Sequence, residues 1–280
     1  MVKIAVLITV YNRRDVTLNG LKTLYRAISN LGKDYYFDIY LTDDASTDGT
    51  GEAVMREFQN AKIIRGNGNL YWGGGMRLAW QSAIESGINY DYYLWFNDDS
   101  DLYGNALQTM FESASDNNIV TGAFCDHNGK VSYGGRDSDN RIIEPRDHYQ
   151  EVKMMNGNFV LIPAKIYHTI GAITPRLKHG GGDFDYGFRA NKAGFKVILS
   201  NRYVGVADRH DEYIPKYCSS KLTFCRRWEV LHSPVYSPSE HFKFNCKYNG
   251  IVSALKSFFV SYVGVFFPLV YKKMKDSLIH

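Results

Sequence analysis

Hydrophobic and polar positions follow two alternating periodicities through the first two hundred residues. Short apolar runs rich in β-branched side chains predict buried strands, whereas apolar residues at helical spacing predict helices. The expected strands lie at residues 3–10, 37–41, 62–64, 92–96, 119–124, 131–133, 159–162 and 195–199. The expected helices lie at residues 16–31, 52–58, 76–84 and 184–192. This alternation predicts an α/β fold with a mainly parallel sheet and helices on both of its faces.

The pattern changes toward the end of the chain, where aromatic and basic residues mix without a strand rhythm. We expect one domain over residues 1–210 and a helical, basic and aromatic extension over residues 211–280. Residues 257–271 are uncharged, but a spanning helix needs about 20 residues and Pro268 interrupts this run, so no span is expected. The apolar start of the chain leads into a basic segment without a cleavage site, which favours a buried strand over a signal peptide.

Composition and charge narrow the class of protein. A chain of 280 residues with 45% hydrophobic residues can bury a sizeable core, which excludes intrinsic disorder. Its four cysteines match no metal-binding spacing, so we expect reduced thiols and a cytoplasmic protein. Residues 201–280 hold 12 basic and 6 acidic side chains, whereas the preceding 200 residues hold 21 and 23. This basic end favours an anionic partner or a membrane surface, and no nucleic-acid partner is expected.

Acidic residues follow two of the predicted strands, at the sheet edge where α/β proteins bind ligands. Asp43 and Asp44 follow the second strand, and Asn97, Asp98 and Asp99 follow the fourth. Adjacent carboxylates repel unless a cation joins them, and oxygen ligands suit Mg²⁺ or Mn²⁺ bound together with a diphosphate. The alternative is a solvated turn in which an aspartate caps the next helix.

Four motifs occur in an order that is informative as a set. They are Thr9-Val10-Tyr11-Asn12-Arg13, the stretch from Thr42 to Thr50 (TDDASTDGT), Asn97-Asp98-Asp99, and the stretch from Gly181 to Arg189 (GGDFDYGFR). Together they resemble family 2 glycosyltransferases of the GT-A fold, over roughly residues 1–210. The resemblance implies an inverting, metal-dependent enzyme that moves a sugar from a nucleoside-diphosphate sugar to a hydroxyl group.

The resemblance also implies roles for residues at the nucleotide. Thr9 and Tyr11 match positions that lie against the base, and Arg13 belongs to the same motif. Asp44 matches the carboxylate that accepts a hydrogen bond from the imide of uracil or thymine. Gly74 lies in a glycine-rich stretch that matches a region bordering the phosphates, where glycine permits close backbone approach.

Arg77, in the same stretch, is expected at a phosphate, with a solvated arginine as the alternative. Asp98 and Asp99 match the metal motif, and Asp98 is also expected near the nucleotide. Asn97 stands where many relatives carry a first aspartate, so the resemblance favours Asp99 as the metal ligand. His210 matches a histidine that reaches the metal or the diphosphate, and a surface histidine is the alternative.

The last motif supplies the expected catalytic residue. Asp183 matches the general base that takes a proton from the acceptor hydroxyl. Its alternative role, as the N-cap of the following helix, is compatible with that chemistry. Arg189 is expected to form an ion pair with Asp183, and Asp185 to play a supporting part.

The expected partners follow from this assignment. The donor is a UDP- or dTDP-sugar, and the acceptor is a glycan or a lipid-linked glycan, as in bacterial surface polysaccharide synthesis. Residues 251–275 are expected to touch the inner face of the cytoplasmic membrane, or else to pack on the body of the protein or on a second subunit in a homodimer. Two other functions stay open: a non-catalytic sugar-nucleotide-binding protein and a sugar-nucleotide nucleotidyltransferase.

Overall fold

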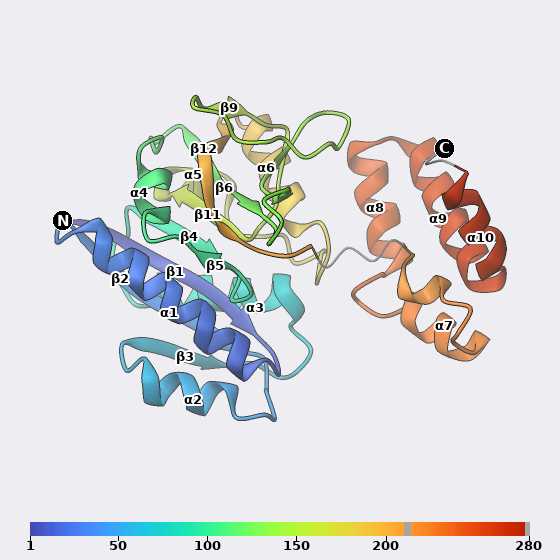
Figure 1. Cartoon of the computed structure of the whole chain (residues 1–280), viewed down its shortest axis with the longest axis horizontal. Helices are drawn as coiled ribbons and strands as arrows, with labels where there is room; N and C mark the ends of the chain where they lie inside the picture. Colours follow the sequence, from blue (N-terminus) through green and yellow to red (C-terminus); the bar gives the residue numbers. More distant parts are fainter. Residues whose placement is uncertain (210–213, 278–280) are drawn as a thin grey trace. The chain divides into compact units, whose positions relative to one another are not determined.

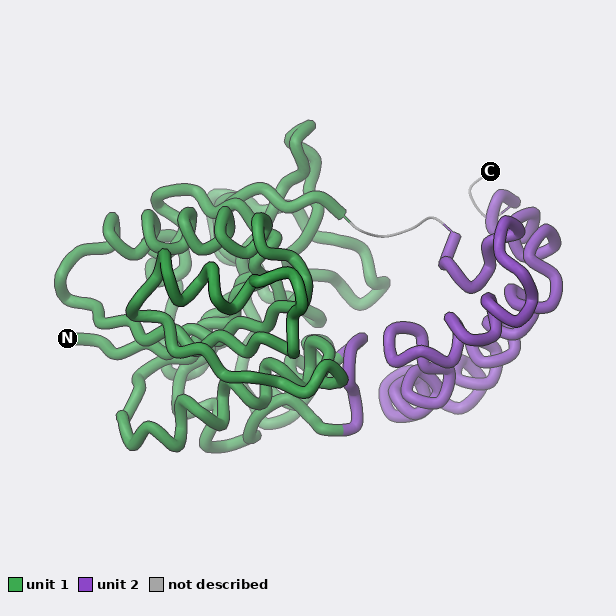
Figure 2. Tube along the Cα trace, turned by 90° about the horizontal axis from the view of Figure 1, so that it is seen from below, with its two compact units in different colours: residues 1–175, 182–209 green, residues 176–181, 210–280 purple. Residues whose placement is uncertain are grey.

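The chain forms two compact units. The computed structural model describes residues 1–209 and 214–277. The first unit holds residues 1–175 and 182–209, and the second holds residues 176–181 and the chain from residue 210 onward (Figure 2). The boundary that we expect at residue 210 stays a prediction.

The first unit is built on a mixed sheet with the order β3-β2-β1-β4-β11-β6-β12-β5 (Figure 1). Its strands are β1 (Val2–Val10), β2 (Tyr35–Asp43), β3 (Ala61–Arg65), β4 (Tyr92–Phe96), β5 (Asp101–Leu102), β6 (Asn118–Cys125), β11 (Phe159–Pro163) and β12 (Lys196–Val206). Strands β1 to β4 pair in parallel, as do β6 and β12, whereas β11 runs antiparallel between β4 and β6. The predicted α/β fold with a mainly parallel sheet is confirmed.

Helices cover both faces of this sheet, because side chains of each strand alternate between the faces. Ile4, Val6 and Ile8 of β1 point into one core, and Ala5 and Leu7 point into the other. The first core includes residues of α1 (Arg14–Leu31), α2 (Thr50–Glu57) and α4 (Ala106–Phe111). The second core includes residues of α3 (Tyr71–Glu85), α5 (Ala164–Ile170) and α6 (Gly182–Lys192).

Helix α3 begins five residues earlier than the sequence predicts. Three of its first five residues are glycines, which are not typical of helices, so the sequence pattern does not indicate this start. A side chain at Gly75 would overlap the side chain of Thr9 at the end of β1. Thr42 of β2 donates its hydroxyl proton to the carbonyl of Gly75 over 2.9 Å. Glycine has low helix propensity, but here it lets the helix backbone lie directly on the strand ends.

Four short strands complete the first unit. They are β7 (Val131–Tyr133), β8 (Gly135–Arg136), β9 (Gln150–Glu151) and β10 (Met154–Met155). Strands β7 and β9 extend the main sheet, while β8 and β10 form a separate antiparallel pair. The pair places Arg136 opposite Met154, just before the turn at residues 156–158.

The second unit is helical. It contains η1 (Lys216–Cys218), α7 (Phe224–Leu231), α8 (Pro238–Tyr248), α9 (Ile251–Phe266) and α10 (Pro268–Asp276). Pro268 separates α9 from α10, as a residue without a backbone N–H should. Gly264 lies within α9 without interrupting it. A side chain at this position would collide with Cys218, so glycine allows the close approach of η1 to α9. Within residues 1–209 and 214–277, no helix combines the length and the apolar character that crossing a bilayer requires.

Candidate active site

The predicted motifs meet at one edge of the sheet. Strands β1, β2 and β4 are parallel neighbours, so the loops after them emerge at the same edge. These loops begin at Tyr11, Asp44 and Asn97. The N-terminus of α3 lies against the ends of β1 and β2. The structure therefore brings the first three motifs together.

The first two loops are tied to each other by side-chain hydrogen bonds. The backbone N–H of Asn12 donates to Ser46 Oγ over 2.9 Å, and Asn12 Oδ1 accepts from the backbone N–H of Thr47 over 2.7 Å. Asp48 accepts from the backbone N–H of Arg14 over 3.0 Å, at the start of α1. The same carboxylate accepts the Thr50 hydroxyl over 2.5 Å, at the start of α2. These bonds, first the Thr50 hydroxyl and then the Arg14 amide, lower the pKa of Asp48.

Three residues at this edge adopt left-handed backbone angles that side chains other than glycine rarely take. They are Asn12 (φ 48°), Ala45 (φ 60°) and Tyr71 (φ 54°). Asn12 follows β1, Ala45 follows β2, and Tyr71 is the first residue of α3. Such angles carry strain and concentrate in ligand-binding loops, where the surrounding structure holds them in place.

Asp44 organises the loop that leads into α3. Its carboxylate is 4% exposed. It accepts backbone N–H groups from Gly68 over 2.7 Å, from Leu70 over 2.8 Å and from Tyr71 over 3.2 Å. A carboxylate has about four acceptor positions, so these bonds leave room for one more donor. The predicted contact between Asp44 and a base imide stays a prediction.

The other predicted nucleotide residues lie beside that loop. Tyr11 is exposed, Thr9 is half-buried beneath the first turn of α3, and Gly74 is buried against Leu70. Arg77 is half-buried and donates to the carbonyl of Thr174 over 2.9 Å, and burial lowers its pKa. The structure thus gives Arg77 a protein partner, and its contact with a phosphate stays a prediction.

Arg13 joins the two carboxylates of the predicted metal motif. Its Nη1 donates to Asp98 Oδ1 over 2.9 Å and to Asp99 Oδ2 over 3.2 Å. Asp98 is only 2% exposed, and its second oxygen accepts the hydroxyl of Thr17 over 2.5 Å. Burial raises the pKa of Asp98, and the Arg13 charge and the Thr17 hydrogen bond oppose that rise. The side chain of Asp99 is more accessible.

These residues fit a divalent cation that also binds a diphosphate. The two carboxylate oxygens converge on a single atom, Arg13 Nη1. Among residues 1–209 and 214–277, no three His, Cys, Asp or Glu side chains gather as a metal site would need. Mg²⁺, however, is commonly held by one or two carboxylates, with phosphates and water completing its shell. His210, the third predicted ligand, lies outside the described residues.

Trp72 connects the metal motif to the expected general base, a role that its place in the sequence does not indicate. Its Nε1 donates to Asn97 Oδ1 over 2.9 Å. Side chains at Gly157 or Gly182 would press on its ring, so both backbones lie against it. The ring also packs edge-on against Trp95, with 5.6 Å between centroids. No spacing in the sequence signals these contacts, because they join residues up to 110 positions apart.

Asp183 lies in the first turn of α6, which begins at Gly182, so the alternative role of Asp183 as the N-cap of this helix is wrong. Its Oδ2 accepts the backbone N–H of Gly157 over 3.0 Å, and its Oδ1 accepts that of Phe184 over 2.9 Å. Burial raises the pKa of Asp183 above the ordinary aspartate value, and the backbone N–H groups and the charge of Arg136 only partly oppose it. No motif in the sequence indicates that Arg136 acts on Asp183.

The expected ion pair between Arg189 and Asp183 is wrong. Arg189 Nε instead donates to Asp185 Oδ2 over 2.8 Å. Residues four apart share a helix face, whereas residues six apart do not. Arg189 also donates to the carbonyls of Ile170 and Ala172, which fastens α6 to the segment after α5.

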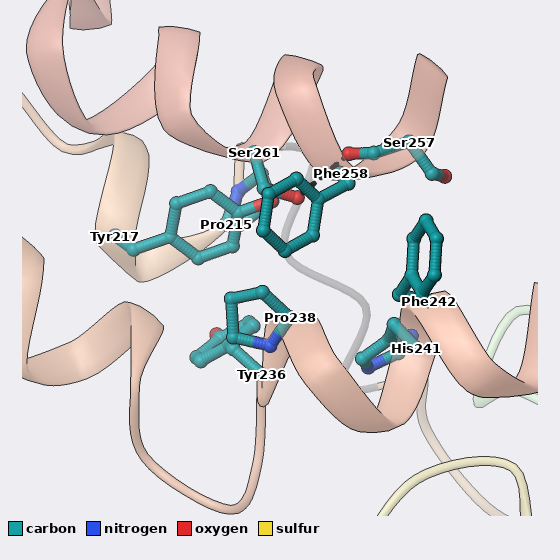
Figure 3. Close-up of a pocket in the computed structure, with 9 residues that line it drawn as sticks. All are labelled: Pro215, Tyr217, Tyr236, Pro238, His241, Phe242, Ser257, Phe258 and Ser261. Carbon is teal, nitrogen blue, oxygen red and sulfur yellow. Dashed lines mark hydrogen bonds between the residues drawn. The ribbon is translucent and has the colours of Figure 1, made fainter. Parts of the chain in front are cut away.

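A cavity in the helical unit is separate from these residues. Its volume is about 190 Å³, and side chains of η1, α8 and α9, with Pro215 and Tyr236, line it (Figure 3). The lining residues are Pro215, Tyr217, Tyr236, Pro238, His241, Phe242, Ser257, Phe258 and Ser261. None of them is a predicted site residue.

Comparison with known proteins decides the family. The family model described as glycosyl transferase family 2 matches residues 5–171, which span more than half of the chain. The chain belongs to glycosyltransferase family 2. It is therefore a glycosyltransferase, as the ordered motifs predict. No curated protein matches its sequence.

Solved structures similar to this glycosyltransferase share its GT-A fold. A mannosyltransferase from Pyrobaculum calidifontis, PcManGT in complex with GDP-Man and Mn²⁺, is 12% identical with a TM-score of 0.56, over 98% of this chain and 79% of that one. TarS 1–349 of S. aureus in complex with UDP is 15% identical with a TM-score of 0.53, over 92% and 80%. GalNAc-T7 with UDP, GalNAc and Mn²⁺ is 14% identical with a TM-score of 0.54. The alignment covers 92% of this chain but only 53% of the GalNAc-T7 chain.

Proposed function

We propose that this glycosyltransferase moves a sugar, with inversion, from a UDP- or dTDP-sugar to a hydroxyl of a glycan or lipid-linked acceptor. The observation that carries the proposal is the chain of contacts from the metal motif to the base. Trp72 donates a hydrogen bond to Asn97 and packs against Gly157. The backbone N–H of Gly157 donates in turn to Asp183. These contacts support one site that includes the acid pair and Asp183, as single-displacement chemistry requires.

Asp183 is proposed to receive the proton of the acceptor hydroxyl. As that oxygen forms its bond to the anomeric carbon, the bond from this carbon to the diphosphate oxygen breaks and its electron pair leaves with the diphosphate. The raised pKa of Asp183 makes its carboxylate a better proton acceptor than an ordinary aspartate. Backbone N–H groups of Gly157 and Phe184 fix its two oxygens, so little reorientation is needed.

Asp99 and Asp98 are proposed to hold a divalent cation, Mn²⁺ or Mg²⁺, which would neutralise the charge of the leaving diphosphate. Two of the similar structures are complexes with Mn²⁺. A purely binding protein has no need of a base, and the link from Asp183 through Trp72 to Asn97 favours the enzyme.

The donor experiment is a thermal-shift screen with UDP-, dTDP- and GDP-sugars, each with and without Mn²⁺. A ligand at a hundred times its dissociation constant stabilises the folded state by about 2.7 kcal/mol. We expect stabilisation by the uridine or thymidine compounds in the presence of Mn²⁺, because Asp44 has an acceptor position for an imide N–H. Stabilisation by GDP-sugars alone would overturn the assignment of uracil or thymine as the nucleobase. No shift with any donor would overturn the proposed function.

Helices α9 and α10 share an exposed apolar face, which is consistent with a membrane that carries a lipid-linked acceptor. Val252, Leu255, Phe259 and Phe266 are exposed and recur at helical spacing along one side of α9. Leu269, Val270 and Met274 are exposed on α10, and Lys256, Lys272 and Lys273 are exposed beside these apolar residues. Apolar side chains with flanking lysines favour the surface of an anionic bilayer. We propose that these helices hold the enzyme at the inner face of the cytoplasmic membrane.

Vesicle flotation checks this surface. The intact protein is expected to float with anionic phospholipid vesicles, less so at high salt and not with neutral vesicles. The double variant Val252→Ser, Phe259→Ser should stay at the bottom of the gradient. Met55→Ser, which alters an exposed apolar residue of α2, should float like wild type. If the intact protein does not float and its mass doubles with concentration, the face binds a second copy instead.

A further inference from the structure

Arg13 fills the position between the two carboxylates that the proposed cation would need. A single nitrogen, Nη1, contacts both Asp98 Oδ1 and Asp99 Oδ2. Arginine stays charged at any physiological pH, so its guanidinium already offsets the repulsion between the adjacent carboxylates. A cation that arrives alone must displace this group before it can reach both oxygens.

Asp98 is held more firmly than the arginine. Asp98 is buried, and its second oxygen is bonded to Thr17 of α1. The backbone of α1 lies directly on the backbone of Asp98: a side chain at Gly20 would overlap the Asp98 carbonyl, and glycine makes this close contact possible. Arg13, by contrast, is a long side chain that is 40% exposed. Arg13 is therefore the partner that can move.

We infer that Arg13 couples the binding of the divalent cation to the binding of the donor diphosphate. Without a diphosphate, Arg13 occupies the carboxylates and weakens cation binding. When a diphosphate is present, its oxygens offer the guanidinium an alternative anionic partner that matches its planar fork. Arg13 leaves the carboxylates, and the cation binds to them. This inference rests on the proposed function, since it assumes a cation at Asp98 and Asp99.

The coupling has a direction that can be measured from either side. If a diphosphate strengthens cation binding by some factor, the cation must strengthen diphosphate binding by the same factor. Part of this factor comes from direct contact between the cation and the phosphates. The part that depends on Arg13 is the part that its substitution removes.

The test measures Mn²⁺ affinity by electron paramagnetic resonance of the free ion, with and without UDP. In wild type, we expect weak Mn²⁺ binding that UDP strengthens by more than about tenfold. In Arg13→Gln, Mn²⁺ alone should bind more tightly than to wild type, and the strengthening by UDP should shrink severalfold. Arg14→Gln is the matched control, because the Arg14 side chain forms an ion pair with the exposed Asp15 and, among the described residues, none with a predicted metal ligand. It should behave like wild type.

Arg13→Lys is a second variant that keeps the inference testable if Arg13→Gln does not fold. It keeps the charge beside the carboxylates, so Mn²⁺ binding without UDP should stay weak. It lacks the planar fork, so the strengthening by UDP should fall. If Arg13→Gln binds Mn²⁺ no more tightly than wild type, or if both variants keep the full effect of UDP, the inference is wrong while the proposed function stands. If Mn²⁺ binds to none of the proteins even with UDP, both are wrong.

Discussion

Replacing Asp183 by asparagine is expected to abolish sugar transfer while leaving donor affinity near that of wild type. The amide cannot take the acceptor proton, and loss of a general base lowers the rate by about 10²–10⁴-fold. In the proposed mechanism Asp183 acts on the acceptor, so the loss should fall on kcat rather than on donor binding. Single-turnover rates and calorimetric titration of the donor measure the two effects separately.

The pH dependence provides a second readout of the same residue. Asp183 must be deprotonated to act, and its burial raises its pKa. The acidic limb of the kcat/KM profile is therefore expected above the ordinary aspartate range, with activity rising as pH rises through that limb. Asp15→Asn, an exposed carboxylate in the first turn of α1, should leave the profile unchanged. A wild-type rate in Asp183→Asn, or retained anomeric configuration in the product, would refute the assignment.

Replacing Asp99 by asparagine is expected to weaken metal-dependent nucleotide binding by at least about 10–100-fold and to abolish transfer. This range is the loss typical of residues that only support a metal ligand, and an amide oxygen carries no charge to offset that of a cation. Asp99 is less buried than Asp98, so the protein should still fold. Calorimetric titration of UDP with and without Mn²⁺ measures the effect.

Asp101→Asn is the matched control for this variant. Asp101 lies two residues further along, is exposed, and accepts a hydrogen bond from Asn19 over 2.6 Å. It should keep the wild-type dependence on Mn²⁺. The metal assignment fails if Asp99→Asn keeps both its calorimetric affinity and its turnover.

Sequence periodicity identified most elements of the sheet, because buried parallel strands are continuous apolar runs. The sequence pattern predicts strands at residues 92–96 and 131–133, and β4 and β7 lie at these residues. Strand β12 extends to Val206, well past its predicted end at residue 199. Its last residues pair with β6 and β5, and pairing between distant segments leaves no local pattern. The antiparallel insertion of β11 between β4 and β6 is equally invisible to periodicity.

In the candidate site too, the sequence indicates some residues, whereas others are found only in the folded structure. Asp99 and Asp183 stand at positions that the motifs mark, because those positions follow a strand or open a helix. The partners of these residues come from elsewhere. Arg13 reaches Asp98 across 85 positions, and Trp72 reaches Asn97 across 25. Such contacts depend on how elements pack, and only the folded chain brings them together.

The cross-ties between the loops after β1 and β2 have a thermodynamic consequence. Asn12 and Asp48 bind those loops to each other and to the starts of α1 and α2. In the proposed nucleotide site, the protein itself thus holds the backbone of these two loops, and their conformational entropy is lost on folding rather than on binding. Binding has to restrict only a few exposed side chains, such as Tyr11 and Arg13. Any adjustment to a bound nucleotide is therefore expected in these exposed side chains rather than in the backbone of the two loops.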